Sequence, residues 1–283
     1  MKHIRIISPS GVIEAEYITR AKDRLESWGY RVSIGAHAMG QYGRFSGTEA
    51  ERLVDLNEAF ADASVDVVLC SRGGYGLQQI VDKIVLPQRP KSEWPLVVGF
   101  SDVTVLHALM SLHGVPSLHA SMCKALATLP EDSVTVGELR KALEEGVAYH
   151  APKEFELPSL EGEVVIGGNL SVLYGLQGTA YSLNAIIDSL GVFPVLLLED
   201  IGERHYHVER MLHNLRLSGV FSRVKAVIIG QFTDCDDDPR MPFSLQKTIE
   251  QVIGEAGCPV FFGLPYGHDE VNVPVRLGGV VKG

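Results

Sequence analysis

A serine stands between a buried apolar run and an apolar-periodic helix in the segment PLVVGFSDVTVLHAL. A serine at such a turn is held clear of the sheet, where the next amide and the positive end of the helix face a developing negative charge. This pattern predicts that Ser101 is a nucleophile and that the amide of Asp102 stabilises the anion. Gly99 would relieve crowding in the turn, but Val103 occupies the second glycine position of G-x-S-x-G. The simpler interpretation is that Ser101 only caps the helix.

Three glycines follow another apolar run in the segment VVLCSRGGYGLQQI. Gly73, Gly74 and Gly76 can take positive φ and let backbone amides approach a ligand closely. Loops at the carboxyl ends of parallel strands line the crevice where ligands bind, so we expect this loop beside the Ser101 turn. A phosphate-binding loop is disfavoured because the G-x-x-x-x-G-K-[ST] pattern is missing. A tight turn without function is the remaining alternative.

A serine nucleophile also needs a base and an acid that orients the base. His268 lies in GLPYGHDE, a Gly- and Pro-rich loop suited to an exposed, positioned side chain. The run VLLLEDIGE places Glu199 and Asp200 at the end of a buried strand, where a carboxylate must be hydrogen-bonded. Glu203 lies four residues further on, so the pattern alone leaves the acid open. The order Ser, Glu, His matches α/β-hydrolases, although such triads also arise convergently.

The first half of the chain alternates β-branched runs with helical patterns, which predicts an α/β fold with a parallel sheet flanked by helices. The pair Thr48 and Glu51 matches the capping box of a helix start. The expected strands are 4–7, 31–34, 65–70 and 96–100, and the expected helices are 14–28, 48–61, 76–83, 102–112 and 136–145.

The pattern fades into a polar, Pro-containing stretch after Gly146. We therefore predict an N-terminal domain over 1–146, a linker over 147–162 and a C-terminal domain over 163–283. The second half carries apolar runs and one amphipathic helix, which predict a smaller α/β or α+β domain. The runs are 164–166, 195–198 and 224–229, and the helix is 206–218.

The composition is that of a globular protein, with 46% hydrophobic residues and a formal charge of −10. The acidic balance disfavours nucleic acid and anionic membrane surfaces as partners. The start, MKHIRIISPSG, lacks the apolar stretch of an export signal, and no segment approaches the length of a membrane span. Four scattered cysteines, Cys70, Cys123, Cys235 and Cys258, indicate neither zinc nor disulfides. We expect a cytoplasmic protein without metal or cofactor.

Taken together, these segments resemble the L,D-carboxypeptidase family of serine peptidases, which also contains the microcin C self-immunity peptidases. The resemblance extends nearly from end to end. It rests on SPSG at 8–11, RFSGTEAERLVDLNEA at 44–59, SRGGYG at 71–76, GFSDVTVLH at 99–107, GGNLSVL at 167–173, LEDIGE at 198–203, HVERML at 207–212 and LPYGH at 264–268. The family usually continues further past the segment matching VPVRLGGVVKG at 273–283.

The resemblance implies a nucleophile at Ser101 and a general base at His268. It implies that the orienting acid is Glu199 rather than Glu203. It implies an oxyanion hole formed by the amides of Gly74 and Asp102. It further implies a parallel-sheet N-terminal domain, a smaller C-terminal domain that supplies Glu and His, a homodimer, and no metal.

The activity that the resemblance implies is release of the terminal D-alanine from murein tetrapeptides during peptidoglycan recycling. A carboxypeptidase must recognise a free carboxylate, and Arg72 is the cation nearest to the glycine loop in sequence. The alternative for Arg72 is a structural ion pair or a solvated side chain. Two other functions stay open: hydrolysis of peptidyl-nucleotide antibiotics by the same machinery, and non-catalytic binding of a small ligand.

Overall fold

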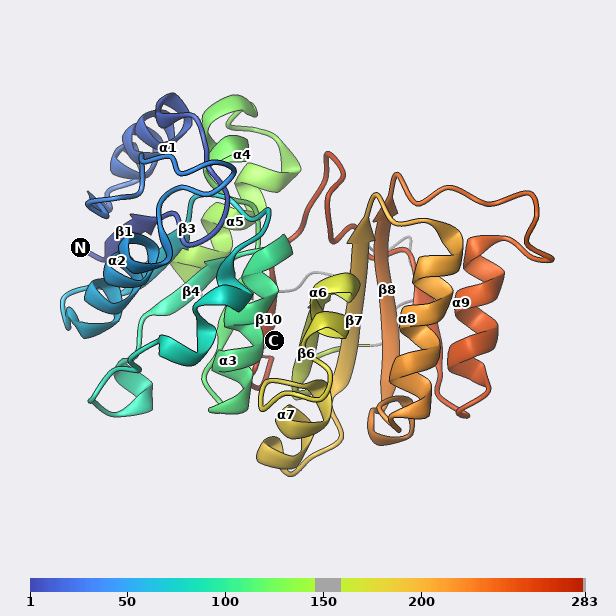
Figure 1. Ribbon diagram of the computed structural model, residues 1–283. Helices are drawn as coiled ribbons and strands as arrows, with labels where there is room; N and C mark the ends of the chain where they lie inside the picture. The colour runs from blue at the N-terminus through green and yellow to red at the C-terminus, as the bar shows by residue number, and fades with distance from the viewer. Residues whose placement is uncertain (146–158, 282–283) are drawn as a thin grey trace.

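Five strands from the first half of the chain and one from its C-terminal end form a six-stranded, mostly parallel sheet (Figure 1), and the alternating pattern of the first half predicts such a sheet. The computed structural model describes residues 1–145 and 159–281. The strand order is β10-β5-β4-β3-β1-β2, in which only β10 runs antiparallel to its neighbour. The strands are β1 (His3–Ile7), β2 (Arg31–Ile34), β3 (Val67–Cys70), β4 (Leu96–Gly99), β5 (Ser117–His119) and β10 (Val275–Leu277).

Helices cover both faces of this sheet, and each face has its own apolar core. One core joins the sheet to α1 (Ala15–Ser27), α4 (Cys123–Thr128) and α5 (Val134–Glu145). The other core joins the sheet to α2 (Glu49–Ala61) and α3 (Thr104–Leu112). The predicted capping box begins α2, with the Glu51 amide donating to Thr48 Oγ1 and the Thr48 amide donating to Glu51 Oε2.

The helix expected over 76–83 is wrong. The segment instead forms two short 3₁₀ turns, η1 (Leu77–Gln79) and η2 (Val81–Lys83). The chain enters with Gly76 at φ 141° and breaks at Ile80 with φ −125°, so α-helical hydrogen bonding cannot run through it. The Leu77 amide donates to the Asp102 carboxylate at 3.0 Å, which holds η1 against the Ser101 turn. The remaining 3₁₀ turns are η3 (Lys91–Glu93), η4 (Ser101–Val103) and η5 (Phe221–Arg223).

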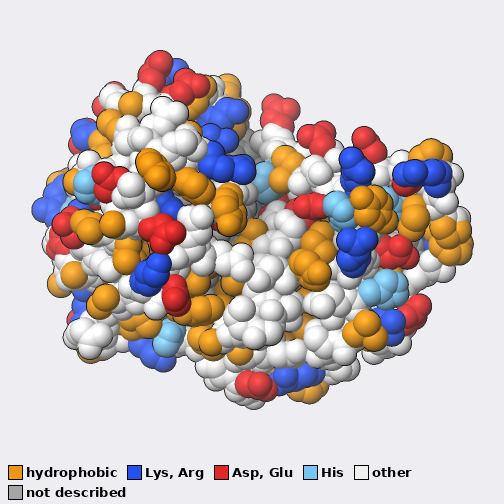
Figure 2. All heavy atoms as spheres, viewed as in Figure 1, with side chains coloured by type: hydrophobic (Ala, Val, Ile, Leu, Met, Phe, Trp, Pro, Cys, Tyr) orange, Lys and Arg blue, Asp and Glu red, His pale blue; other side chains and the backbone are white. Residues whose placement is uncertain are grey.

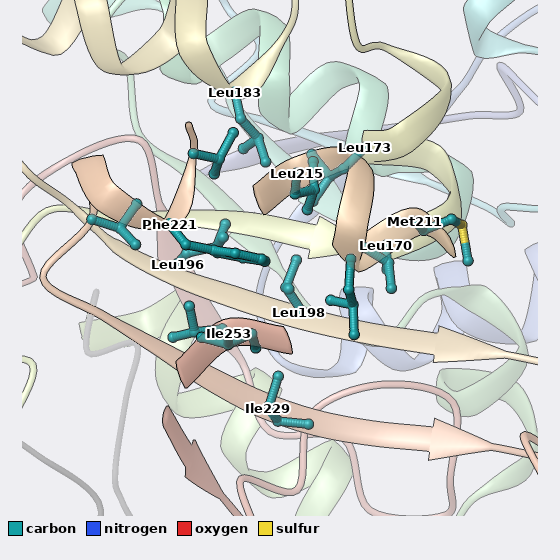
Figure 3. Packing of buried hydrophobic residues seen from close by; sticks show 14 of the residues in the cluster. Leu170, Leu173, Leu183, Leu196, Leu198, Met211, Leu215, Phe221, Ile229 and Ile253 are labelled. Atoms are coloured by element: carbon teal, nitrogen blue, oxygen red, sulfur yellow. The ribbon is translucent and has the colours of Figure 1, made fainter. Parts of the chain in front are cut away.

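The second half forms a four-stranded parallel sheet in the order β6-β7-β8-β9. Its strands are β6 (Val165–Asn169), β7 (Val195–Ile201), β8 (Ala226–Thr233) and β9 (Val260–Phe262), and its helices are α6 (Leu170–Gly175), α7 (Leu183–Leu190), α8 (His205–Leu217) and α9 (Leu245–Gly254). Figure 3 shows Leu196 and Leu198 of β7 in a cluster with Met211 and Leu215 of α8. Burying these apolar side chains fixes β7, the strand that carries Glu199.

The two sheets are joined by more than one connection. The loop after β9 stands between the two halves in Figure 1 and leads into β10, which pairs with β5 in the first sheet. The helix α3 packs on β6, and the Asn169 amide donates to Thr104 Oγ1 at 3.0 Å. The predicted C-terminal domain, 163–283, thus contains a strand of the first sheet. Residues 147–158 of the predicted linker lie outside the described residues.

Candidate active site

Ser101 occupies a strained turn between β4 and α3. Its φ is 64°, in the left-handed region that residues other than glycine rarely adopt. Gly99 ends β4 at φ 157°, and a Cβ there would lie 2.9 Å from the Val103 side chain, so the tight turn requires glycine. Non-glycine residues held in such conformations cluster at functional sites, and this is the geometry of a nucleophile elbow.

The glycine loop after β3 lies directly against Ser101. A Cβ on Gly73 would lie only 2.7 Å from the Cβ of Ser101, so the two segments approach as closely as a glycine permits. The Gly73 carbonyl accepts a 3.0 Å hydrogen bond from the Gly11 amide, which joins the loops after β1 and β3. Gly74 follows at φ 103° and lines the same cavity as Ser101. The two loops therefore meet where ligands bind in sheets of this kind.

The side chain of Asp102 is buried and braces this arrangement from behind. Its Oδ2 accepts hydrogen bonds from Ser10 Oγ at 2.6 Å and from the Leu77 amide at 3.0 Å. Burial raises the pKa of Asp102, and these two hydrogen bonds oppose the rise. Arg52, also buried, donates to the carbonyls of Pro9 and Gly76. These contacts fix the three loops relative to one another.

His268 lies against Glu199. The distance from His268 Nδ1 to Glu199 Oε2 is 2.7 Å, and the Glu199 carboxylate is fully buried. The His268 ring packs on the Phe100 ring with centroids 4.8 Å apart, which brings it beside the residue preceding Ser101. His268 and Ser101 line the same cavity, so the first sheet supplies the serine and the second supplies the acid.

Hydrogen bonds on both sides hold the His268 loop. Gln231 at the end of β8 accepts from the Asp269 amide at 3.1 Å and donates to the Val271 carbonyl at 2.9 Å. The backbone amide of Asn272 donates to Thr135 Oγ1, and the Thr135 hydroxyl donates to the Glu270 carbonyl. Because one partner belongs to β8 and the other to α5, both halves of the molecule position the imidazole.

The other two acids that the sequence offered point elsewhere. Glu203 Oε2 lies 3.1 Å from His207 Nδ1, one turn along α8. Asp200 accepts hydrogen bonds from the Asn169 side chain and from the Ser171 amide, so it caps the start of α6. Burial raises the pKa of Asp200 to about 7. Only the carboxylate of Glu199 reaches His268 among these three.

The cavity in front of Ser101 has a volume of about 1120 Å³. Arg72 lines it, but its guanidinium also donates to the Val12 carbonyl at 2.5 Å. Lys124 lines it as well, and its exposed ammonium has no ion pair among the described residues. No sequence motif marks Lys124 as a functional residue. Asp269 and Glu270 also line the cavity. Figure 2 shows basic side chains gathered on one wall of the hollow and acidic ones on the other.

Within residues 1–145 and 159–281, no group of three or more His, Cys, Asp or Glu side chains is arranged to hold a metal ion. The four cysteines are buried and unpaired. No helix in those ranges is long and apolar enough to cross a membrane.

Two family models match the chain. The LD-carboxypeptidase N-terminal domain matches residues 4–120, and the LD-carboxypeptidase C-terminal domain matches residues 161–282. The murein tetrapeptide carboxypeptidase of Pseudomonas aeruginosa is 30% identical over 95% of this chain and 89% of its own length. The probable murein peptide carboxypeptidase of Bacillus subtilis is also 30% identical, over 97% of this chain and 86% of its own length.

Solved structures share the fold. The muramoyltetrapeptide carboxypeptidase from Oxalobacter formigenes superposes with a TM-score of 0.80 at 25% identity, over 98% of this chain and 93% of that chain. The microcin C7 self immunity protein MccF in its wild type apo state superposes with a TM-score of 0.78 at 20% identity, over 98% of this chain and 91% of that one. At that identity the second likeness concerns the fold alone.

Proposed function

This chain belongs to the LD-carboxypeptidase family, and on that premise we propose that it is a serine carboxypeptidase that releases the terminal D-alanine from murein tetrapeptides. The observation that carries the proposal is the 2.7 Å contact between His268 Nδ1 and the buried Glu199 Oε2, because His268 lines the same cavity as the strained Ser101. The names of the relatives from Pseudomonas aeruginosa and Oxalobacter formigenes support the substrate class.

In this reaction Ser101 Oγ attacks the carbonyl carbon that joins the L-centre of the third residue to D-alanine, while His268 Nε2 takes the hydroxyl proton. Glu199 fixes the tautomer of His268 and stabilises the imidazolium. When the C–N bond breaks, His268 returns the proton to the departing amine. Water, deprotonated by the same imidazole, then hydrolyses the acyl-enzyme and regenerates Ser101.

The negative charge of the tetrahedral intermediate needs donors that are in place before the reaction. We assign this task to the amides of Gly74 and Asp102, as the family resemblance implies. The close approach of the glycine loop to Ser101 supports the assignment. Each such donor contributes about 3 to 4 kcal/mol to lowering the barrier.

The free carboxylate of D-alanine requires a cation in a protein whose formal charge is −10. We propose that Arg72 and Lys124 together form this subsite. Arg72 is tied to the Val12 carbonyl, which limits its motion, and Lys124 is free to close on the ligand.

The decisive test is mass spectrometry of murein tetrapeptide incubated with the purified protein. The wild type is expected to yield tripeptide and free D-alanine, Ser101→Ala to yield neither, and EDTA to leave the wild type active. An active Ser101→Ala variant, or loss of activity with EDTA, would refute the serine mechanism. A wild type that leaves the tetrapeptide intact would refute the substrate.

We also propose that the protein works in the cytoplasm and as a homodimer. Four buried, unpaired cysteines support a reducing compartment. The homodimer rests on the family resemblance. Cell fractionation and sedimentation at micromolar protein concentration test the two statements separately.

A further inference from the structure

A fully buried group of polar side chains surrounds Glu199, and none of its members lines the cavity. Glu199 Oε1 has no hydrogen-bond partner among the described residues, although Oε2 is bound to His268. Both ring nitrogens of His119 and the hydroxyl of Tyr266 are likewise buried and unpartnered. Buried polar atoms without partners are uncommon in native proteins, and each calls for an explanation.

The geometry of His119 suggests what the group does. Its Nε2 lies 4.0 Å from Glu199 Oε1, and both side chains are fully buried. The imidazole stacks on the Tyr266 ring, with centroids 3.8 Å apart and planes at 26°. His119 ends β5, where it is paired with Gly99 of β4 on one side and with Val275 of β10 on the other. The strand pairing therefore fixes the backbone of His119, and the stack on Tyr266 fixes the plane of its ring.

His119 and Glu199 do not form an ion pair, although only 4.0 Å separates them. Burial lowers the pKa of His119 well below its ordinary value, and the neighbouring His107 and His268 lower it further. The ring is thus neutral near pH 7, with one N–H to donate and one nitrogen that accepts. The titratable groups that face it are Glu199 from β7, His107 from α3, and Tyr266 and His268 from the loop before β10.

His107 provides a contrast within the same layer. Its two ring nitrogens are occupied by Ser117 Oγ at 2.8 Å and by the Gly99 carbonyl at 2.9 Å. It is a core histidine whose hydrogen bonds are complete. The ring of His119 is equally buried but has no hydrogen bond among the described residues, and its Nε2 lies 4.0 Å from an oxygen of the acid that orients the base.

We propose that His119 is a positioning residue that donates its Nε2–H to the second oxygen of Glu199 through one bridging water molecule. A separation of 4.0 Å is too long for a direct bond and short enough for one water to span. The bond would satisfy the free oxygen of a buried carboxylate and keep the other oxygen aimed at His268. The inference rests on the proposed catalytic role of Glu199.

Three variants separate positioning from packing. In His119→Gln the side-chain amide can still donate near the position of Nε2, whereas His119→Leu fills similar space without a donor. His107→Gln is the control for changing a buried histidine in the same layer. Folding is checked by circular dichroism and thermal melting, and kcat and KM are measured with murein tetrapeptide. The rate of Ser101 labelling by a fluorophosphonate provides a readout that does not depend on the natural substrate.

We expect His119→Leu to lose about 10- to 100-fold in kcat and in labelling rate with little change in KM, as for loss of a hydrogen bond to a charged group. His119→Gln should stay within about threefold of the wild type, and His107→Gln should retain both rates. Full activity in folded His119→Leu, or equal losses in folded His119→Gln and His119→Leu, would overturn the proposal. If the tetrapeptide is not a substrate, the labelling rates still decide the question.

A measurement on the wild type keeps the proposal testable should the His119 variants not fold. Long-range ¹H–¹⁵N spectra of protein labelled at histidine report which ring nitrogen carries the proton. We expect His119 to be neutral at pH 7 and protonated on Nε2. A proton on Nδ1, or a charged ring, would overturn the proposal.

Discussion

Replacing Gly73 by alanine should disable the site without unfolding the protein. The added Cβ would lie 2.7 Å from the Cβ of Ser101 and 3.0 Å from the Phe100 carbonyl oxygen. Neither is the far end of a flexible side chain, so the loop or the elbow must move. Reaching ordinary van der Waals contact at 3.4 Å requires a shift of about 0.7 Å.

A displacement of this size moves the amide of Gly74 relative to Ser101, the proposed nucleophile. A misplacement of about 1 Å costs on the order of 100-fold in rate, and loss of one oxyanion donor costs about 100- to 1000-fold in kcat. We therefore expect kcat of Gly73→Ala to fall by about 100-fold, with a small change in KM. Overpacking should lower the free energy of unfolding by about 1 to 3 kcal/mol.

The matched control is Gly137→Ala in α5, where an added Cβ meets nothing within 4 Å. This change should leave kcat unaltered and stabilise the helix by up to about 1 kcal/mol. Steady-state kinetics on murein tetrapeptide and urea unfolding followed by circular dichroism measure both variants. A folded Gly73→Ala enzyme with kcat within about twofold of the wild type would show that the close approach does not position the site.

Glu199→Gln should reduce kcat by about 10⁴-fold, as in comparable triads, whereas Glu203→Gln should change it little; a severe loss in only the second variant would transfer the orienting role. Lys124→Met and Arg72→Met should each raise KM for the tetrapeptide by about 10-fold or more and should have little effect on KM for a C-terminally amidated analogue. Equal effects on both peptides would remove these residues from the carboxylate subsite. Burial lowers the pKa of His107 from 6.5 to about 4. Between these two pH values, His107 is protonated in the unfolded chain and neutral in the native protein. Stability should fall as the pH drops from 6.5 towards 4, and His107→Gln should reduce the fall by up to about 3 kcal/mol in urea titrations; an unchanged pH slope would contradict this.

Local patterns predicted the serine turn because everything that shapes it is close in sequence. An apolar strand, a glycine two residues before Ser101 and a helix directly after it lie within a dozen positions. The capping box at Thr48 is equally local and is present in the structure. For the acid, the residues alone left Glu199 and Glu203 open, since the choice depends on which carboxylate meets an imidazole 69 positions away in the chain.

What the sequence could not predict depends on contacts between distant segments. β5 is three residues long, and it is a strand because β4 and β10 bind it on both sides. His119 therefore carried no signal of its own. Lys124 belongs to no sequence motif, and it is a candidate for the carboxylate subsite only because α4 places it at the cavity wall. The expected helix over 76–83 was wrong because the backbone leaves the helical region at Ile80, with φ −125°, and divides the segment into two 3₁₀ turns.

The late position of β10 in the chain has a consequence for how the protein is made. β5 ends at His119, but β10 is synthesised about 150 residues later, which at ribosomal speeds is a delay of roughly 8 to 30 s. Throughout that time the edge of β5 is unpaired, and an open strand edge can pair with other chains. His268 lies on the approach to β10, so the proposed base and the closing strand emerge almost together. A nascent chain should therefore be free of peptidase activity until its first sheet is closed.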